Sequence, residues 1–155
     1  MIHLVTGGSG SGKSAYAEQC ILDFGGTRRV YIATMQPFGA EGQARIARHR
    51  KMRAAKKFST IECYTNLKEV ELEPGSDVLL ECMSNLVANE MYMESGAGCH
   101  ADQAILEGIR ELNQQCSNLV IVTNEVFSES VPDSPEMKEY KRILGRINRE
   151  IAAMA

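Results

Sequence analysis

Residues 7–14, Gly-Gly-Ser-Gly-Ser-Gly-Lys-Ser, constrain the fold of this chain more than any other segment. They match the pattern G-x-x-x-x-G-K-[ST], a glycine-rich loop whose backbone N–H groups surround a phosphate. The flanks agree, because the apolar run 2–5 predicts a buried strand and residues 14–22 have helical apolar spacing before Gly25-Gly26. A glycine-rich turn without a ligand is the alternative, but the complete pattern in this context favours a phosphate-binding loop.

The loop pattern assigns a role to each of its residues. Lys13 is expected to reach the β- and γ-phosphates of a nucleotide, and the Ser14 hydroxyl to complete the shell of a Mg²⁺ ion. The remaining loop residues, expected to bind phosphate through their backbone, are Gly7, Gly8, Ser9, Gly10, Ser11 and Gly12.

The chain as a whole has the properties of one soluble domain, residues 1–155. Its 17 Lys+Arg against 20 Asp+Glu give no general footprint for nucleic acid, and no apolar run approaches the roughly 18 residues of a membrane span. No signal peptide is recognisable, and the five cysteines form no C-x-x-C pair. We therefore expect a cytoplasmic protein with reduced thiols, most of them small core residues. The cysteines are Cys20, Cys63, Cys82, Cys99 and Cys116.

Strand and helix patterns alternate along the rest of the chain. This alternation predicts a parallel α/β sheet with helices on both faces. We expect His3 to be structural and His100 to be exposed near a helix cap. The expected strands are residues 29–34, 58–63, 77–82 and 119–124; the expected helices are 41–57, 83–93, 100–115 and 136–154; residues 66–74 are expected as a short helix or turn, and 127–135 as a loop over the site.

The helix 41–57 carries a stripe of basic residues. Arg45, His49 and Arg53 are spaced i, i+4, i+8 and therefore share one helix face. Positive charge on either side disfavours the imidazolium form, so His49 would tend to be neutral and nucleophilic at pH 7. The alternative is a solvated helix face, and the spacing alone favours that interpretation.

Carboxylates occur at both ends of the strand 77–82. In phosphate-loop enzymes a carboxylate at the carboxyl end of a neighbouring strand orders the hydration shell of Mg²⁺, which makes Glu81 the metal candidate, with a structural role as the alternative. Asp77, at the start of the strand, is expected as a turn or capping residue. Asn124 and Glu125 follow another strand at its carboxyl end, where ligands bind in open α/β sheets.

Several further segments accompany the phosphate loop in a fixed order and together cover nearly the whole chain. They are Leu4-Val5-Thr6-Gly7-Gly8, Tyr31-Ile32-Ala33-Thr34, Ala44-Arg45-Ile46-x-x-His49-Arg50-x-x-Arg53, Ser59-Thr60-Ile61-Glu62, Leu79-Leu80-Glu81-Cys82 with Asn89, Val122-Thr123-Asn124-Glu125-Val126, Val131-Pro132 and Gly145-Arg146-x-Asn148. In these segments the chain resembles the bifunctional adenosylcobinamide kinase and adenosylcobinamide-phosphate guanylyltransferase family of cobalamin biosynthesis.

The resemblance implies a fold, a reaction and a set of ligands. It implies a P-loop NTPase core of the RecA-like class, a homotrimer, GTP and ATP as substrates with Mg²⁺, and adenosylcobinamide and its phosphate as acceptors. In such an enzyme His49 takes GMP from GTP to form a covalent intermediate. Arg45 and Arg53 would neutralise phosphates, and Glu62 and Glu81 would contact guanine or metal. The nucleotide-binding residues expected outside the phosphate loop are Thr34, Arg45, Arg53, Glu62, Asn124 and Glu125.

The chain departs from the usual family pattern at several positions. Gly10 replaces an arginine, Ala40-Glu41-Gly42 replaces an Asp-Glu-Met-like run, and Phe58 replaces a tryptophan. These departures bear on nucleotide preference and rate. The family also continues into one more strand after the last helix, so we expect a truncated or missing terminal strand and an unpaired sheet edge.

Two other functions are compatible with the phosphate loop. A P-loop small-molecule kinase without covalent guanylylation would use His49 and its arginines only to clamp phosphate. A nucleotide-dependent switch would instead change its affinity for a protein partner. No segment resembles the GTPase motif Asn-Lys-x-Asp, which disfavours the switch.

Overall fold

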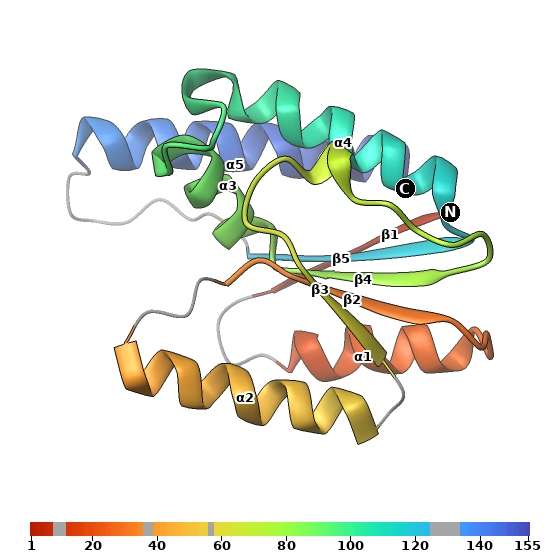
Figure 1. The fold of residues 1–155 in the computed structure, drawn as a ribbon. Helices are drawn as coiled ribbons and strands as arrows, with labels where there is room; N and C mark the ends of the chain where they lie inside the picture. The colour runs from red at the N-terminus through yellow and green to blue at the C-terminus, as the bar shows by residue number, and fades with distance from the viewer. Residues whose placement is uncertain (8–11, 36–38, 56–57, 125–133) are drawn as a thin grey trace.

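The computed structural model describes residues 1–7, 12–35, 39–55, 58–124 and 134–155 (Figure 1). Within these residues five strands form one sheet in the order β1-β5-β4-β2-β3, and every pair of neighbours is parallel. The strands are β1 Ile2–Gly7, β2 Arg29–Ala33, β3 Phe58–Glu62, β4 Asp77–Glu81 and β5 Asn118–Asn124. The helices are α1 Lys13–Asp23, α2 Gly39–Ala55, α3 Met83–Tyr92, α4 Ala101–Gln115 and α5 Pro135–Met154, with short 3-10 turns η1 Leu67–Glu69 and η2 Gly98–His100.

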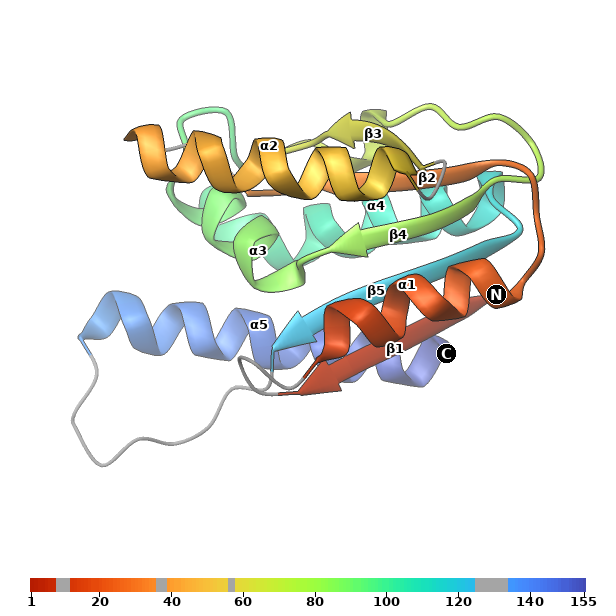
Figure 2. The same ribbon diagram turned by 90° about the horizontal axis from the view of Figure 1, so that it is seen from below.

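Helices cover both faces of the sheet (Figures 1 and 2). Helices α1 and α2 lie on one face, and α3, α4 and α5 lie on the other. Helix α1 contacts β1, β5 and β4, whereas α2 contacts the edge strand β3. The predicted parallel α/β sheet with helices on both faces is therefore confirmed.

The central strands are buried on both sides, which explains their continuous apolar sequences. Successive residues of β4 alternate between two core clusters: Leu79 packs on the α1 side, and Val78 and Leu80 pack on the opposite side. In β5, Val120 likewise faces α1, and Ile121 faces the other cluster. Because side chains alternate with a period of two, the face of the sheet on which the last side chains of β4 and β5 lie is fixed.

The predicted elements agree with the structure, with one difference that has a physical explanation. The sequence predicts Pro135 in a loop, but it is the first residue of α5, where its fixed φ and missing N–H are tolerated. The Ser134 hydroxyl caps this helix by accepting a hydrogen bond of 3.2 Å from the Met137 N–H. The segment 66–74, predicted as a short helix or turn, contains the single turn η1, and Asn66 precedes it with a φ of 57°. The rest of the expected loop, 127–133, lies outside the described residues.

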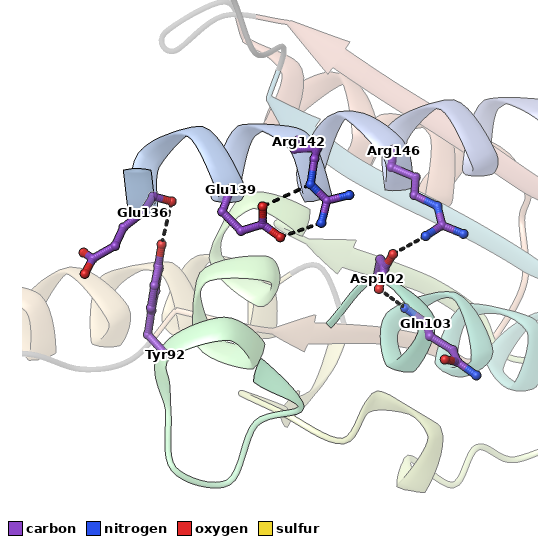
Figure 3. A network of polar contacts seen from close by, with 7 residues as sticks. All are labelled: Tyr92, Asp102, Gln103, Glu136, Glu139, Arg142 and Arg146. Atoms are coloured by element: carbon purple, nitrogen blue, oxygen red, sulfur yellow. Dashed lines mark hydrogen bonds and ion pairs between the residues drawn. The ribbon is translucent and has the colours of Figure 1, made fainter. Parts of the chain in front are cut away.

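A polar network joins α5 to the helices that pack beside it (Figure 3). Arg146 of α5 forms an ion pair with Asp102 of α4, and the other Asp102 oxygen accepts a hydrogen bond of 2.8 Å from the Gln103 N–H. The Tyr92 hydroxyl, at the end of α3, donates to the Glu136 carbonyl at 3.2 Å. These contacts hold the three helices together on the face of the sheet opposite α1.

The other single-residue predictions have mixed outcomes. The expectation that most cysteines are core residues is wrong, because only Cys63 is buried, Cys99 is exposed and the other three are half-buried. The expectation of a turn or capping residue is wrong for Asp77, because it is the buried first residue of β4 and accepts a hydrogen bond of 3.0 Å from the side chain of Asn118 in the neighbouring strand β5. His3 packs beside the Phe24 ring with centroids 5.3 Å apart, and His100 is exposed at the N-cap of α4. Among the described helices, none is long and apolar enough to cross a membrane.

Candidate active site

The carboxyl ends of all the described strands lie along one edge of the parallel sheet. In the register of the sheet, Glu81 pairs with Val122 on one side and with Ala33 on the other, and Gly7 pairs with Asn124. This is the edge at which ligands bind in open α/β sheets. The predicted phosphate loop therefore begins at the same edge that carries the predicted metal carboxylate.

The two described ends of the phosphate loop face a hollow of about 500 Å³, with Gly7, Gly12, Lys13 and Tyr16 among its lining residues. Gly12 has a φ of 79° as the N-cap of α1, a conformation that side chains other than glycine adopt only with strain. Lys13 is the first residue of α1, so its ammonium group and the positive end of the helix act on the same space. This combination suits an anion. Gly8, Ser9, Gly10 and Ser11 lie outside the described residues.

The two predicted metal residues are in direct contact. The Ser14 hydroxyl donates a hydrogen bond to Oε1 of Glu81. The expectation that Glu81 belongs to a strand next to the phosphate-loop strand is wrong, because β5 lies between β1 and β4. The contact forms nevertheless, since α1 packs across β5 and also contacts β4, which brings its first turn over the end of that strand.

This arrangement fits a Mg²⁺ ion bound together with a nucleotide. A serine hydroxyl that donates its proton to a carboxylate keeps two lone pairs for a metal, and Mg²⁺ prefers oxygen ligands. Within the described part of the chain, no group of three or more His, Cys, Asp and Glu side chains forms a ready metal cage. Ser14 and Glu81 thus fit a Mg²⁺ ion whose other ligands are waters and phosphate oxygens, the usual arrangement for this ion.

A tyrosine outside the predicted set of site residues holds the other side of the carboxylate. The Tyr31 hydroxyl donates a hydrogen bond of 2.5 Å to Oε2 of Glu81. The sequence holds one signal for it: Tyr31 is two residues from the end of β2, and Glu81 pairs with Ala33, so the strand period places both side chains on one face. Using that signal requires knowing that β2 and β4 are neighbours.

Thr34 holds the ends of β2 and β4 together. It is fully buried, and its hydroxyl oxygen accepts a hydrogen bond of 2.8 Å from the Cys82 N–H and lies 2.9 Å from the Cys82 carbonyl. The Asn89 side chain donates to the Thr34 carbonyl at 2.8 Å. These bonds give Thr34 a structural task beside Glu81, and its contact with nucleotide stays a prediction.

The predicted residue Glu62 lies away from the Ser14–Glu81 pair. It ends β3, pairs in register with Ala33 and is therefore two strand spacings, about 10 Å, from Glu81. Glu62 forms an ion pair with Arg50 of α2 and accepts a hydrogen bond of 3.2 Å from the Tyr64 hydroxyl. The Arg50–Glu62 pair ties α2 to the edge strand β3.

The remaining predicted residues are placed by their backbone alone or not at all. The positions 45, 49 and 53 lie within α2 and hence on one face of it, but the side chains of Arg45, His49 and Arg53 lie outside the described part of the structure. Asn124 ends β5 opposite Gly7, and its side chain is likewise not described. Glu125 lies outside the described residues. The roles of all five stay predictions.

A second hollow of about 500 Å³ lies at the end of β3 and has the opposite charge character. Glu62, Glu69 and Glu71 line it, so it repels a polyphosphate. Its lining thiol is inert: burial first, then the carboxylates of Glu90 and Glu69, raise the pKa of Cys63 from 9.0 to about 11. Charge therefore makes the hollow at Lys13, and not the hollow at the end of β3, the candidate for binding a nucleotide.

Comparison with known proteins agrees with this geometry. The family model described as "Cobinamide kinase / cobinamide phosphate guanyltransferase" matches residues 3–155. The chain belongs to this family. Two members are bifunctional adenosylcobalamin biosynthesis proteins CobU: that of Escherichia coli (strain K12) is 36% identical over 169 residues, and that of Salmonella typhimurium (strain LT2) is 35% identical over 169 residues. Each match covers 100% of this chain and 92% of the relative.

Membership of the cobinamide kinase / cobinamide phosphate guanyltransferase family confirms two predictions. The family resemblance inferred from the short motifs is correct over almost the whole chain. The parallel sheet, with the glycine loop between its first strand and first helix, is the P-loop NTPase fold of that family, as expected.

Proposed function

We propose that this chain is a bifunctional kinase and guanylyltransferase of adenosylcobalamin biosynthesis. It phosphorylates adenosylcobinamide and then transfers GMP from GTP to the product, giving adenosyl-GDP-cobinamide. The observation that carries this proposal is the contact of Ser14 with Glu81 beside Lys13, in a chain that matches the cobinamide kinase / cobinamide phosphate guanyltransferase family over residues 3–155.

In the kinase step, the described residues bind and orient the triphosphate. The Lys13 ammonium group and the amino end of α1 attract the β- and γ-phosphates, while the backbone of Gly12 is shaped for close approach. The Ser14 hydroxyl and the Glu81 carboxylate would hold Mg²⁺, which neutralises charge that develops on the transferred phosphoryl group. The acceptor hydroxyl of adenosylcobinamide attacks the γ-phosphorus as the bond from this phosphorus to the β–γ bridging oxygen breaks, which releases the nucleoside diphosphate. The hydroxyl proton leaves to solvent or to a phosphate oxygen.

In the transfer step, we propose His49 as the nucleophile. Its neutral imidazole nitrogen forms a bond to the α-phosphorus of GTP as the bond to pyrophosphate breaks, which leaves a His-GMP phosphoramidate. A phosphate oxygen of adenosylcobinamide phosphate then attacks the same phosphorus, and the P–N bond breaks to restore the imidazole. Arg45 and Arg53, on the same helix face, would neutralise phosphate charge in both halves of the reaction.

The described contacts also support a second function, a P-loop small-molecule kinase without covalent guanylylation. Ser14, Glu81 and Lys13 would serve phosphoryl transfer, a reaction that needs no covalent step on a histidine. The two functions differ in one product: only the bifunctional enzyme joins a GMP unit to cobinamide phosphate.

The proposal extends to assembly and location. We propose a homotrimer with sites near subunit contacts, a cytoplasmic location and no nucleic-acid partner. The family resemblance supports the trimer, and the formal net charge of -3 supports the absence of a nucleic-acid surface. Light scattering on the purified protein would test the trimer by giving three times the mass of the chain.

Product analysis tests the two activities separately. The protein is incubated with adenosylcobinamide, Mg²⁺, ATP and GTP, and the cobinamide products are separated and weighed by mass spectrometry. Wild type should form both the phosphate and the GDP derivative, and His49→Ala should form the phosphate only. His100→Ala is the matched control, because this exposed histidine caps α4, which lies on the face of the sheet opposite α1 and α2. If His49→Ala still forms the GDP derivative, the covalent step is wrong.

A further inference from the structure

We propose that Tyr31 is a positioning residue for the Glu81 carboxylate, holding it in the orientation in which it meets Ser14 and a nucleotide-bound Mg²⁺. The inference rests on the metal site of the proposed function and adds to it a residue on another strand. Neither the family description nor the names of the relatives assign a role to this tyrosine.

The two oxygens of the carboxylate have separate partners. Tyr31 of β2 donates to Oε2 at 2.5 Å, and Ser14 of α1 donates to Oε1. Both donors are hydroxyl groups, and they approach from different elements. With Oε2 bound to the phenol, the remaining oxygen, Oε1, is aimed at the first turn of the helix that follows the phosphate loop.

The phenol is the rigid partner in this contact. The Tyr31 side chain is 5% exposed and packs in the same cluster as Ala17, Ile21 and Leu79, on the α1 side of the sheet. A packed aromatic ring on a strand has few accessible rotamers, whereas a glutamate side chain is long and flexible. The ring therefore sets the position of the carboxylate, and the half-buried carboxylate does not set the position of the ring.

The backbone around Glu81 is also braced, which makes side-chain orientation the remaining variable. Thr34 holds the Glu81–Cys82 main chain through hydrogen bonds of 2.8 and 2.9 Å to the Cys82 N–H and carbonyl. When the phenol hydroxyl is removed, the main chain of Glu81 stays in place and only its carboxylate gains freedom. Removal of the hydroxyl should therefore affect only the binding of ligands that contact the Glu81 carboxylate.

Those ligands are Mg²⁺ and its coordinated water, and the phosphates themselves are held by other groups. The phosphates interact with Lys13, the amino end of α1 and the loop backbone. Loss of the Tyr31 hydroxyl should therefore weaken nucleotide binding in the presence of Mg²⁺ and leave metal-free nucleotide binding almost unchanged.

Calorimetric titration of GDP into Tyr31→Phe, at a series of Mg²⁺ concentrations and in excess EDTA, tests this inference. We expect about a tenfold loss of GDP affinity at saturating Mg²⁺, the size of one lost hydrogen bond to a charged group, and less than about a twofold change in EDTA. Tyr92→Phe is the control, because it also removes a phenol hydrogen bond, that of Tyr92 to the Glu136 carbonyl at 3.2 Å, which involves none of the predicted nucleotide-binding residues. It should bind GDP like wild type under both conditions.

A double-mutant cycle separates positioning from general damage to the fold. In a Glu81→Gln background, Tyr31→Phe should cause no further loss of Mg²⁺-dependent affinity, since the group that it positions has lost its charge. Equal losses in the wild-type and Glu81→Gln backgrounds, or equal behaviour of Tyr31→Phe and Tyr92→Phe, would overturn the inference and leave the proposed function standing. If wild type binds GDP equally with and without Mg²⁺, both the inference and the metal site of the proposed function fail.

A measurement on wild type covers the case in which Tyr31→Phe does not fold. With ¹³Cζ-labelled tyrosine, NMR gives one phenol carbon signal for each of the five tyrosines. Replacing Tyr16, Tyr64, Tyr92 and Tyr140 one at a time with Phe assigns four signals, and the fifth belongs to Tyr31. Addition of Mg²⁺ to the GDP complex should shift the Tyr31 signal and leave the Tyr92 signal in place. If the Tyr31 signal does not respond to Mg²⁺, the phenol does not couple to the metal site and the inference is overturned.

Discussion

The Ser14 hydroxyl donates a hydrogen bond to Glu81 Oε1 even though strand β5 separates β4, which ends in Glu81, from β1, which leads to the phosphate loop. Helix α1 makes this possible because it contacts β1, β5 and β4 on the same face of the sheet. The contact joins a helix start to a strand end and gives a place where a metal and a phosphate can meet.

Replacing the carboxylate should remove most of the phosphoryl-transfer activity. Glu81→Gln keeps the size of the side chain but loses the charge that orients Ser14 and a Mg²⁺ ion, so we expect kcat for adenosylcobinamide phosphorylation to fall by about 100-fold. Glu71→Gln, an exposed residue before β4, should leave kcat unchanged. An initial-rate assay with both variants checks this, and a Glu81→Gln enzyme within a fewfold of wild type would rule out the assigned role.

Gly12→Ala should lower both stability and nucleotide affinity because of backbone strain. Gly12 has a φ of 79°, a left-handed backbone conformation that costs an alanine about 1–2 kcal/mol. No atom of the described residues lies within 4 Å of the position that the alanine methyl would occupy. Gly98 is a matched control, with a φ of 60° and likewise no described atom within 4 Å, in the turn η2 between α3 and α4. Urea unfolding should show similar losses for both alanine variants, and GDP titration should show weaker binding for Gly12→Ala alone.

Thr34→Val should destabilise the fold by about 1–3 kcal/mol. The substitution removes the oxygen that accepts the hydrogen bond from the Cys82 N–H and leaves that group without this partner in a buried setting. Thr34→Ser keeps the hydroxyl oxygen and should therefore lose much less stability. The free energy of unfolding in urea measures both, and equal stability of the valine and serine variants would show that the hydroxyl bonds contribute little.

The raised pKa of the Cys63 thiol predicts that the folded chain loses stability at alkaline pH. Its pKa is raised from 9.0 to about 11 in the folded chain, chiefly by burial, so the unfolded chain ionises this thiol at lower pH than the folded chain does. The protonated Cys63 thiol contributes its full share to the free energy of unfolding below pH 9, and this contribution is lost as the pH rises from about 9 to 11. Urea unfolding between about pH 8 and 11 should show this decline in wild type and a smaller decline in Cys63→Ala.

Much of the fold follows from local patterns whose physical cause is simple. The apolar run of β5 and the strand β4 are buried on both faces, which produces the continuous apolar sequences that mark them as strands. Gly12 marks the start of α1 through its left-handed backbone conformation. Pro135 is misplaced by the sequence pattern because proline is common both in loops and at the first position of a helix, and sequence alone does not separate the two.

The parts of the site that escape prediction depend on contacts between distant segments. Tyr31 meets Glu81 only because β2 and β4 are neighbours in a particular register, and the order β1-β5-β4-β2-β3 is not written in any short motif. The same holds for the link between Thr123 and Asn148, whose hydroxyl and amide oxygen are 2.8 Å apart across β5 and α5. Both residues lie in family segments that are recognisable in the sequence, but neither segment indicates that the two side chains meet.

The covalent intermediate on His49 is the central claim, and one measurement tests it directly. The protein is incubated with Mg²⁺ and GTP, without cobinamide, and its intact mass is measured for wild type, His49→Ala and the control His100→Ala. We predict one added GMP on wild type and on His100→Ala, stable in base and lost in acid, and none on His49→Ala. Unmodified wild type that still binds GTP, or an adduct that persists in His49→Ala, would contradict the claim.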